Sequence, residues 1–285
     1  MFQTDRRASP EIQLSWEEIA QLPTKVREIC LRHGVGIRNQ TDLAAYLEIC
    51  EKVTAEKNSA EPFDPKLCQA QRVLSAIVAC GDESELKEPL SRMASNTLDP
   101  TSKTPSPGKD ALFELETLQY ARHRRLGARL GEPDVVIEAP FGDYFVACKT
   151  INSPENFEKQ LSRGCRQLDR LGSGCVAFNF EPQISAKEPI VVDTSRKLQL
   201  HLDAQLIDLY EKHRRHIDKR LEDDRLDGVM LQISCYANIR ESTSALDVFT
   251  HTVFYSRTNL QQTEAHERFE GFKQSMQGPL CSFRS

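Results

Sequence analysis

A change of pattern near residue 110 constrains the fold of this chain more than any other feature. Before it, residues 15–94 carry apolar side chains at helical spacing. They begin with a capping box at Ser15 and Glu18, and Pro23 is expected to split the first helix. After it, helical and strand patterns alternate in the order α-β-β-α-β-α-β-β. This order predicts an α/β domain with one central sheet and helices on its faces, preceded by a mostly helical N-terminal region.

The segment 96–109 separates the two patterns. It is rich in Pro, Ser and Thr, which is typical of an extended linker. We therefore predict a helical region at 1–95 and an α/β domain at 110–285. Within the domain, helices are expected at 111–131, 153–172 and 198–221, and strands at 134–140, 143–151, 174–180, 227–239 and 246–256.

Composition excludes several classes of protein. The 285 residues include 39% hydrophobic and 28% charged side chains, with no apolar run long enough to cross a membrane. Nine cysteines stand singly, which favours a reducing cytoplasm over a disulfide framework. Zinc-ligand spacings and nucleotide-binding glycine motifs are absent from the sequence. The net charge of −5 restricts any contact with nucleic acid to local basic patches.

The stretch EPDVVIEAPFGDYFVACKT, residues 132–150, predicts a β-hairpin. A two-residue turn centred on Phe141-Gly142 is expected at its middle. That register places three cross-strand pairs on one face: Asp134 with Lys149, Val136 with Ala147, and Glu138 with Phe145. The opposite face is uniformly apolar and is expected in the core: Val135, Ile137, Val146 and Cys148. A carboxylate and an ammonium group would therefore meet at the open end of the hairpin.

This Asp–Lys pair has a plain structural interpretation as well as a functional one. A cross-strand ion pair on a surface contributes about 0.2–1 kcal/mol, and structural ion pairs outnumber catalytic ones. The functional interpretation rests on a resemblance. The segments KDALFELE, EPDVVI and FVACK are similar to the PD-(D/E)xK nuclease superfamily, the restriction-endonuclease-like fold, over about residues 110–180.

The resemblance implies a fold and a set of site residues. The fold is a restriction-endonuclease-like central mixed sheet flanked by helices. Glu114 and Asp134 would hold Mg²⁺ or Mn²⁺, with the backbone carbonyl of Cys148 as a further ligand. Lys149 would position or activate the attacking water. Two carboxylates and a carbonyl suit Mg²⁺, which prefers oxygen ligands and keeps several waters.

Ala147 stands where the family carries an acid, so one metal ligand is missing. Three explanations remain open. A carboxylate from the following helix, Glu155 or Glu158, could replace it. The site could also work with Glu114 and Asp134 alone, or it could be inactive in a fold that only binds.

Other polar side chains are candidates for the same site. In the family, a Gln on the helix after the hairpin often lies near the active site, so Gln167 is a candidate catalytic residue. Four residues are candidates for contacts with nucleic-acid phosphates: Gln160, Arg163, Arg124 and Arg125. Their structural alternatives are a solvated helix face and favourable cations at a helix C-terminus.

The function implied is metal-dependent hydrolysis of DNA phosphodiester bonds by an endonuclease acting in restriction, phage defence or repair. The alternative is a catalytically inactive nuclease-fold module that binds nucleic acid or a protein partner. DNA is the expected partner and no membrane is expected. A homodimer is also considered, because cutting both strands often requires two copies of a site.

Overall fold

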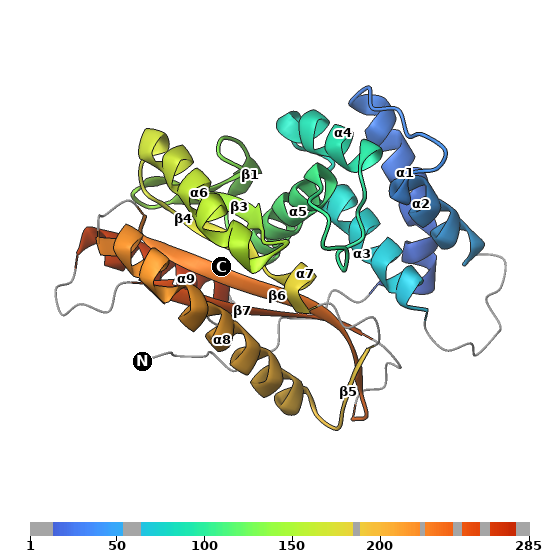
Figure 1. Ribbon diagram of the computed structural model, residues 1–285. Coiled ribbons are helices and arrows are strands. Elements are labelled where there is room, and N and C mark those ends of the chain that lie inside the picture. The colour runs from blue at the N-terminus through green and yellow to red at the C-terminus, as the bar shows by residue number, and fades with distance from the viewer. Residues whose placement is uncertain are drawn as a thin grey trace, which may run out of the picture.

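The computed structural model describes residues 14–53, 64–184, 189–222, 226–241, 247–256 and 263–277. In those ranges the N-terminal region is helical, as predicted. It contains α1 (Trp16–Arg32), α2 (Asp42–Lys52), α3 (Pro65–Ala79), the short 3-10 helix η1 (Ser84–Leu86) and α4 (Lys87–Ser95). Figure 1 shows these helices gathered at one end of the molecule, beside the first helix of the sheet domain.

The start of α1 confirms one prediction and corrects another. The Glu18 N–H donates to Ser15 Oγ (3.2 Å) and the Ser15 N–H donates to Glu18 Oε2 (2.7 Å), which completes the capping box. Pro23 does not split the helix. It lies buried inside a continuous α1, because Leu22 and Val26 on either side of it are anchored in the same core.

Seven strands in the described part of the chain form one mixed sheet. They are β1 (Ala128–Leu130), β2 (Val135–Ala139), β3 (Gly142–Thr150), β4 (Gly174–Asn179), β5 (Ile190–Val192), β6 (Gly228–Ile239) and β7 (Asp247–Ser256). The order is β1-β2-β3-β4-β6-β5, and β7 also pairs with β6. The pairs β3/β4, β4/β6 and β5/β6 are parallel, and the others are antiparallel.

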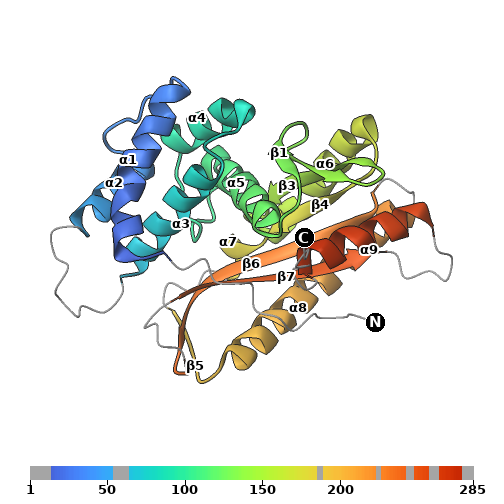
Figure 2. The same ribbon diagram turned by 180° about the vertical axis from the view of Figure 1, so that it is seen from behind.

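Helices cover both faces of the sheet. One hydrophobic cluster joins the first face to α5 (Pro107–His123), α9 (Glu264–Gln277) and the N-terminal helices. A second joins the other face to α6 (Phe157–Leu171) and α8 (Ser195–Glu222). The short η2 (Pro154–Asn156) precedes α6, and α7 (Glu181–Ile184) follows β4. Figure 2, the view from behind, shows α9 lying against β6 and β7. The α/β architecture predicted from the sequence is confirmed at this level.

The N-terminal helices and the sheet share a core. Leu90 of α4, Leu115 of α5 and Val146 of β3 belong to the same buried cluster. The predicted linker at 96–109 is itself packed, since Leu98 is fully buried and α5 already begins at Pro107. The N-terminal helices and the sheet are therefore packed together through one continuous core. The prediction that they are two separate domains remains untested.

The helix expected at 111–131 is shorter than predicted. It ends at His123, Arg125 takes a left-handed φ of 61°, and residues 128–130 become strand β1. The register pairs Arg129 with Val136, so the edge of β2 is satisfied by backbone hydrogen bonds. The strands expected at 174–180, 227–239 and 246–256 and the helix expected at 198–221 are confirmed with small changes at their ends.

The hairpin forms with a register two residues from the predicted one. Ala139 pairs with Gly142, so the turn is Pro140-Phe141, and Gly142 adopts the φ of 115° that favours glycine. The observed pairs include Val136 with Phe145 and Glu138 with Asp143. Because side chains alternate with a period of two, this shift leaves every side chain on its predicted face. The predicted pairs of Asp134 with Lys149, Val136 with Ala147 and Glu138 with Phe145 are replaced.

Candidate functional site

Asp134 accepts two hydrogen bonds at the end of the hairpin. It lies just before β2, and its Oδ2 accepts from the Cys148 N–H (2.7 Å) and from Lys149 Nζ (2.9 Å). The two charged side chains are only 12% and 13% exposed. The predicted meeting of Asp134 and Lys149 therefore occurs despite the altered register, because the long lysine side chain spans the difference.

Lys149 also reaches the backbone carbonyl of Cys148, with 2.8 Å between Nζ and O. The ammonium group thus lies between the two oxygens that the resemblance implies as metal ligands. The Cys148 thiol points the other way, into the core, where Sγ contacts Thr117 Oγ1 of α5 at 3.7 Å. Burial raises the pKa of this thiol well above its usual range, so it stays protonated and unreactive.

Glu114 approaches the same place from α5. Ser106 Oγ caps this helix by accepting from the Gly108 N–H (3.2 Å), and Pro107 occupies its first turn. Burial raises the pKa of Glu114 to about 7, and the negative charge of Asp134 adds to the effect, whereas Arg92 and Lys149 oppose it. Glu114 therefore lies within electrostatic range of Asp134 and Lys149.

A cation from the N-terminal region covers Glu114. Arg92 of α4 donates through both of its terminal nitrogens, to Oε1 at 3.0 Å and to Oε2 at 2.6 Å. The Glu114 side chain is only 5% exposed beneath it. Arg92 also pairs with the exposed Glu88 one turn earlier on α4 (2.8 Å). Each of the two carboxylates of the site therefore carries a side-chain cation, Lys149 on Asp134 and Arg92 on Glu114.

Among the residues that the structure describes, no other carboxylate is shown at the place of the missing acid. Ala147 is fully buried and belongs to the cluster under α6, opposite Val176 of β4. Glu155 is exposed, and Glu158 faces α8, where His216 Nδ1 lies 3.6 Å from its Oε1. In the described ranges, no group of three or more His, Cys, Asp or Glu side chains is placed to hold a metal. These placements do not favour Glu155 or Glu158 as the replacement ligand, and that role stays a prediction.

The donor chemistry that remains still fits a hard divalent ion. Two carboxylates and one carbonyl oxygen are ligands that Mg²⁺ accepts together with waters or substrate phosphates. Asp134 Oδ2 and the Cys148 carbonyl already converge on one cation, the Lys149 ammonium. Glu114 could join them only if its bidentate contact with Arg92 opened.

The remaining predicted residues lie outside this cluster. Gln160, Arg163 and Gln167 are on α6, and Gln167 lies about 15 Å along the helix from its start at Phe157, at about 1.5 Å per residue. Because α6 begins after the end of β3 that carries Lys149 and connects to the parallel strand β4, Gln167 lies toward the opposite end of these strands. The assignment of Gln167 as a catalytic residue is not supported by this placement.

The basic run after α5 is largely structural. Arg124 Nε donates to the Ser275 carbonyl of α9 (3.0 Å), and Arg125 is an exposed residue just beyond the C-cap of α5. Arg122 pairs with Asp82 (2.8 Å) and with Glu83, and it donates to the Ala79 carbonyl. These contacts favour the structural interpretation of Arg124, whereas Arg125 remains a candidate phosphate contact by exposure alone.

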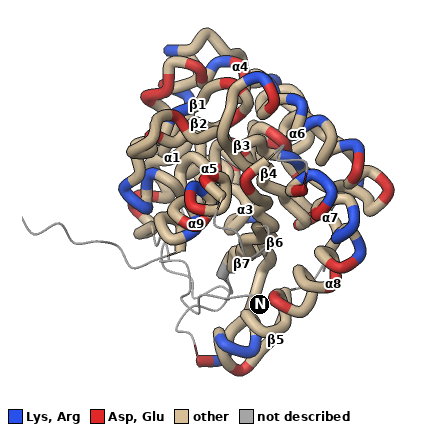
Figure 3. The backbone as a smooth tube through the Cα atoms, turned by 90° about the vertical axis from the view of Figure 1, so that its left-hand side faces the viewer, with Lys and Arg blue, Asp and Glu red and all other residues tan. Residues whose placement is uncertain are grey.

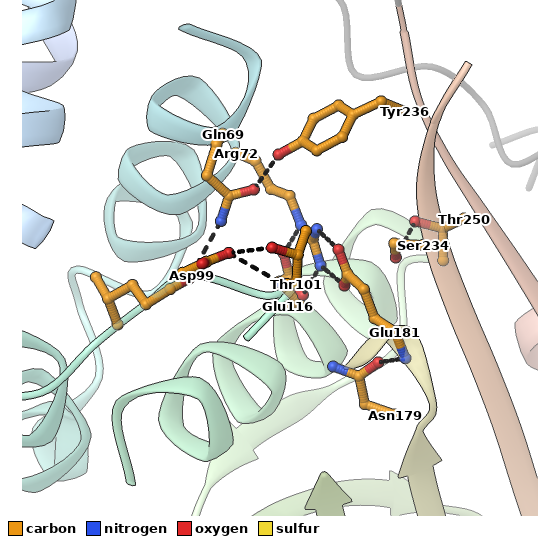
Figure 4. A network of polar contacts seen from close by, with 11 residues as sticks. Gln69, Arg72, Asp99, Thr101, Glu116, Asn179, Glu181, Ser234, Tyr236 and Thr250 are labelled. Carbon is orange, nitrogen blue, oxygen red and sulfur yellow. Dashed lines mark hydrogen bonds and ion pairs between the residues drawn. The ribbon is translucent and has the colours of Figure 1, made fainter. Parts of the chain in front are cut away.

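Sequence reasoning missed a second buried polar cluster, which Figure 4 shows between α3, α5 and α7. Arg72 donates to Glu181 Oε1 and Oε2 (both 2.8 Å) and binds Glu116 through two further nitrogen contacts. Burial raises the pKa of Glu181, and Arg72 lowers it. Gln69 of the same helix binds the Tyr236 hydroxyl. The available signal was Arg72 itself, the single charged residue in the run LCQAQRVLSAIVAC.

This second cluster ties the N-terminal helices to the carboxyl ends of the parallel strands. Nearby, the Lys109 ammonium at the start of α5 is buried and donates to Asn152 Oδ1 (2.8 Å) and the Ser102 carbonyl (2.6 Å). These buried charged groups all have hydrogen-bond or ion-pair partners, because an unpaired buried charge would cost much free energy. We assign the cluster to holding α3, α5 and α7 in place, which fixes the helix that carries Glu114.

Comparison with models of known protein families, with curated proteins and with solved structures gives no significant match. The functional argument therefore rests on the residues themselves. None of the helices in the described ranges is long and apolar enough to cross a membrane.

Proposed function

We propose that this protein is a metal-dependent DNA endonuclease of the restriction-endonuclease-like kind, with Glu114, Asp134 and Lys149 at its active site. The observation that carries the proposal is the convergence of Asp134 Oδ2, the Cys148 carbonyl and Lys149 Nζ within 2.9 Å contacts at the end of a buried hairpin. The order of α5, the β2–β3 hairpin, α6 and β4 along the chain supports it, because it repeats the element order of the resembling family.

The chain's own residues have separate tasks in this proposal. Asp134 and the Cys148 carbonyl would hold Mg²⁺ or Mn²⁺, with Glu114 as a third donor. The ion would supply an acidified water and neutralise charge on the phosphate. Lys149 would place a positive charge beside the scissile phosphate, where negative charge develops. Asp134 orients that lysine through the 2.9 Å contact. The low exposure of both side chains restricts bulk water at this point.

A plasmid-nicking assay tests the proposal. Purified protein is incubated with supercoiled DNA in Mg²⁺ or Mn²⁺ and compared with the Lys149→Ala variant and with Lys66→Ala, which removes an exposed lysine on α3. Wild type and Lys66→Ala should nick the plasmid, while Lys149→Ala should lose at least about 100-fold in rate, as when one electrostatic contact to the transition state is removed. Equal nicking rates for wild type and Lys149→Ala would contradict the assignment of Lys149 to the active site.

A second function is favoured by two specific observations. Ala147 is locked into the core, and Arg92 covers both oxygens of Glu114. Both fit a nuclease fold that has lost its metal and serves as a binding module. In that case wild type would leave the plasmid intact in either metal and would still retard DNA or a protein partner in a gel.

A further inference from the structure

The outer face of α6 carries a stripe of four basic residues, Lys159, Arg163, Arg166 and Arg170, which we call the α6 stripe. All four are exposed. At 3.6 residues per turn they fall within about 60° of one another around the helix axis, and the stripe is about 16 Å long. The opposite side of α6 is equally uniform, with Phe157, Leu161, Cys165 and Leu168 all buried. Figure 3 shows basic residues recurring along α6 on the outside of the molecule.

Helix stability does not account for the α6 stripe. In the described part of the chain, none of its four members forms an ion pair with a carboxylate, and Arg166 donates only to the Ser162 carbonyl of its own helix (3.3 Å). Other arginines are bound to carboxylates, as Arg268 is to Asp227. Like charges three or four residues apart cost a helix about 0.2–0.5 kcal/mol per pair. Binding of an external anion would offset the repulsion between these like charges.

We infer that the α6 stripe binds the phosphate backbone of duplex DNA. A duplex presents one negative charge per about 1.7 Å of its axis, so a stripe of this length faces several phosphates. Three of the four members are arginines, whose guanidinium groups bind phosphate oxygens in pairs. Arg220 of α8 adds a further cation beside the stripe, where it donates to Ser162 Oγ (3.1 Å).

Other polyanionic or surface partners fit less well. A helix that lies on a lipid surface inserts apolar side chains beside its basic ones, and a protein interface has an apolar centre. None of the large apolar side chains exposed in the described ranges is on α6. They are Trp16, Leu31, Phe141, Val191, Leu200 and Ile207.

The α6 stripe is held rigidly relative to the candidate site. At Gly164, α6 touches β4 so closely that an added Cβ would lie 2.7 Å from Val176 Cγ2. The helix begins at Phe157, shortly after β3 ends beside Lys149, so the Lys159 end of the stripe is the end nearest the site. The inference rests on the proposed function for its choice of DNA, but it concerns binding, which is measured apart from cleavage.

Fluorescence anisotropy of a labelled 20-base-pair duplex, titrated with full-length protein in EDTA at several salt concentrations, tests the inference. The stripe variant carries Lys159→Gln, Arg163→Gln, Arg166→Gln and Arg170→Gln. The matched control carries Lys25→Gln, Arg38→Gln, Lys66→Gln and Lys87→Gln, four exposed residues of the N-terminal region. Both variants lose four positive charges from the chain. Circular dichroism checks that both fold, as surface substitutions should.

In the stripe variant, the slope of log Kd against log salt should fall by about 3 to 4 units, at about 0.9 per phosphate contact, while the control keeps the wild-type slope. An unchanged slope in the stripe variant, or an equal loss in the control, overturns the inference. So does a wild type that binds polyglutamate or phosphatidylserine vesicles but no duplex. If wild type binds the duplex through the stripe but does not nick the plasmid, only the proposed function is contradicted. If wild type nicks the plasmid and the stripe variant keeps the wild-type salt dependence of Kd, only the inference is contradicted.

Discussion

Replacing Arg92 with methionine should leave the Glu114 carboxylate buried without its counter-charge. Methionine keeps much of the arginine stem, so the change removes mainly the two contacts at 3.0 and 2.6 Å. Removing one partner of a buried ion pair costs about 3–5 kcal/mol. Arg92 retains 24% exposure, which lets water compensate in part. We therefore expect a loss of about 2–4 kcal/mol in the free energy of unfolding at pH 8.

The loss of stability caused by Arg92→Met should be larger at high pH than at low pH. Burial already raises the pKa of Glu114 to about 7, and loss of Arg92 raises it further. The folded variant then holds a proton that the unfolded chain releases, so its stability falls as pH rises through that range. Protonating a carboxyl costs about 1.4 kcal/mol for each unit by which the pH exceeds its pKa in the unfolded chain. The loss should therefore shrink to about 1–2 kcal/mol at pH 5.5.

Urea unfolding at pH 8 and pH 5.5, followed by circular dichroism, measures both effects. Arg27→Met is the matched control, because Arg27 pairs with Glu51 at a site where both side chains are about half exposed, and such pairs contribute at most about 1 kcal/mol. If Arg92→Met costs no more than Arg27→Met, or costs the same at both pH values, the assignment of Arg92 as the counter-charge of Glu114 fails.

Three further predictions concern other parts of the fold. Arg72→Met should destabilise the protein by at least about 3 kcal/mol in thermal unfolding, and adding Glu116→Gln and Glu181→Gln should restore part of the loss, because the buried carboxylates are then no longer charged. Gly164→Ala should cost about 1–3 kcal/mol against Val176, whereas Gly271→Ala in the open face of α9 should be neutral or stabilising; equal effects would contradict the close packing of α6. Burial lowers the pKa of His213, which stacks on Phe157, so native stability should fall as pH drops below about 6.5, and His213→Leu should flatten that fall in urea titrations.

Long, patterned segments were readable from the sequence. The all-apolar run of β4 and the long helix α8 carry enough residues for their period to be evident, and both are where they were expected. The alternation along the hairpin also placed each side chain on its correct face. The three-residue strands β1 and β5 were missed, because so few residues define no period.

Contacts between segments far apart in the chain could not be predicted from the sequence. The hairpin register depended on whether the turn uses Pro140-Phe141 or Phe141-Gly142, and both leave the same side chains on the same faces. Nothing local to Arg92 indicates that it covers Glu114, since the pair joins α4 to α5 through the packing of the N-terminal helices. The burial of Ala147 under α6 likewise follows from the sheet and not from the motif.

The binding of Mn²⁺ by isothermal titration calorimetry tests the central claim most directly, because it needs no knowledge of the substrate. The protein is titrated as wild type, as Asp134→Asn and as Glu158→Gln, the last removing an exposed carboxylate on α6. The account predicts that wild type and Glu158→Gln bind the ion and that Asp134→Asn binds it at least about 10-fold more weakly. The affinity of wild type should rise as the pH passes through about 7, because Glu114 loses its proton there. A folded wild type that takes up no Mn²⁺, or an Asp134→Asn variant that binds it as well as wild type does, would contradict the claim.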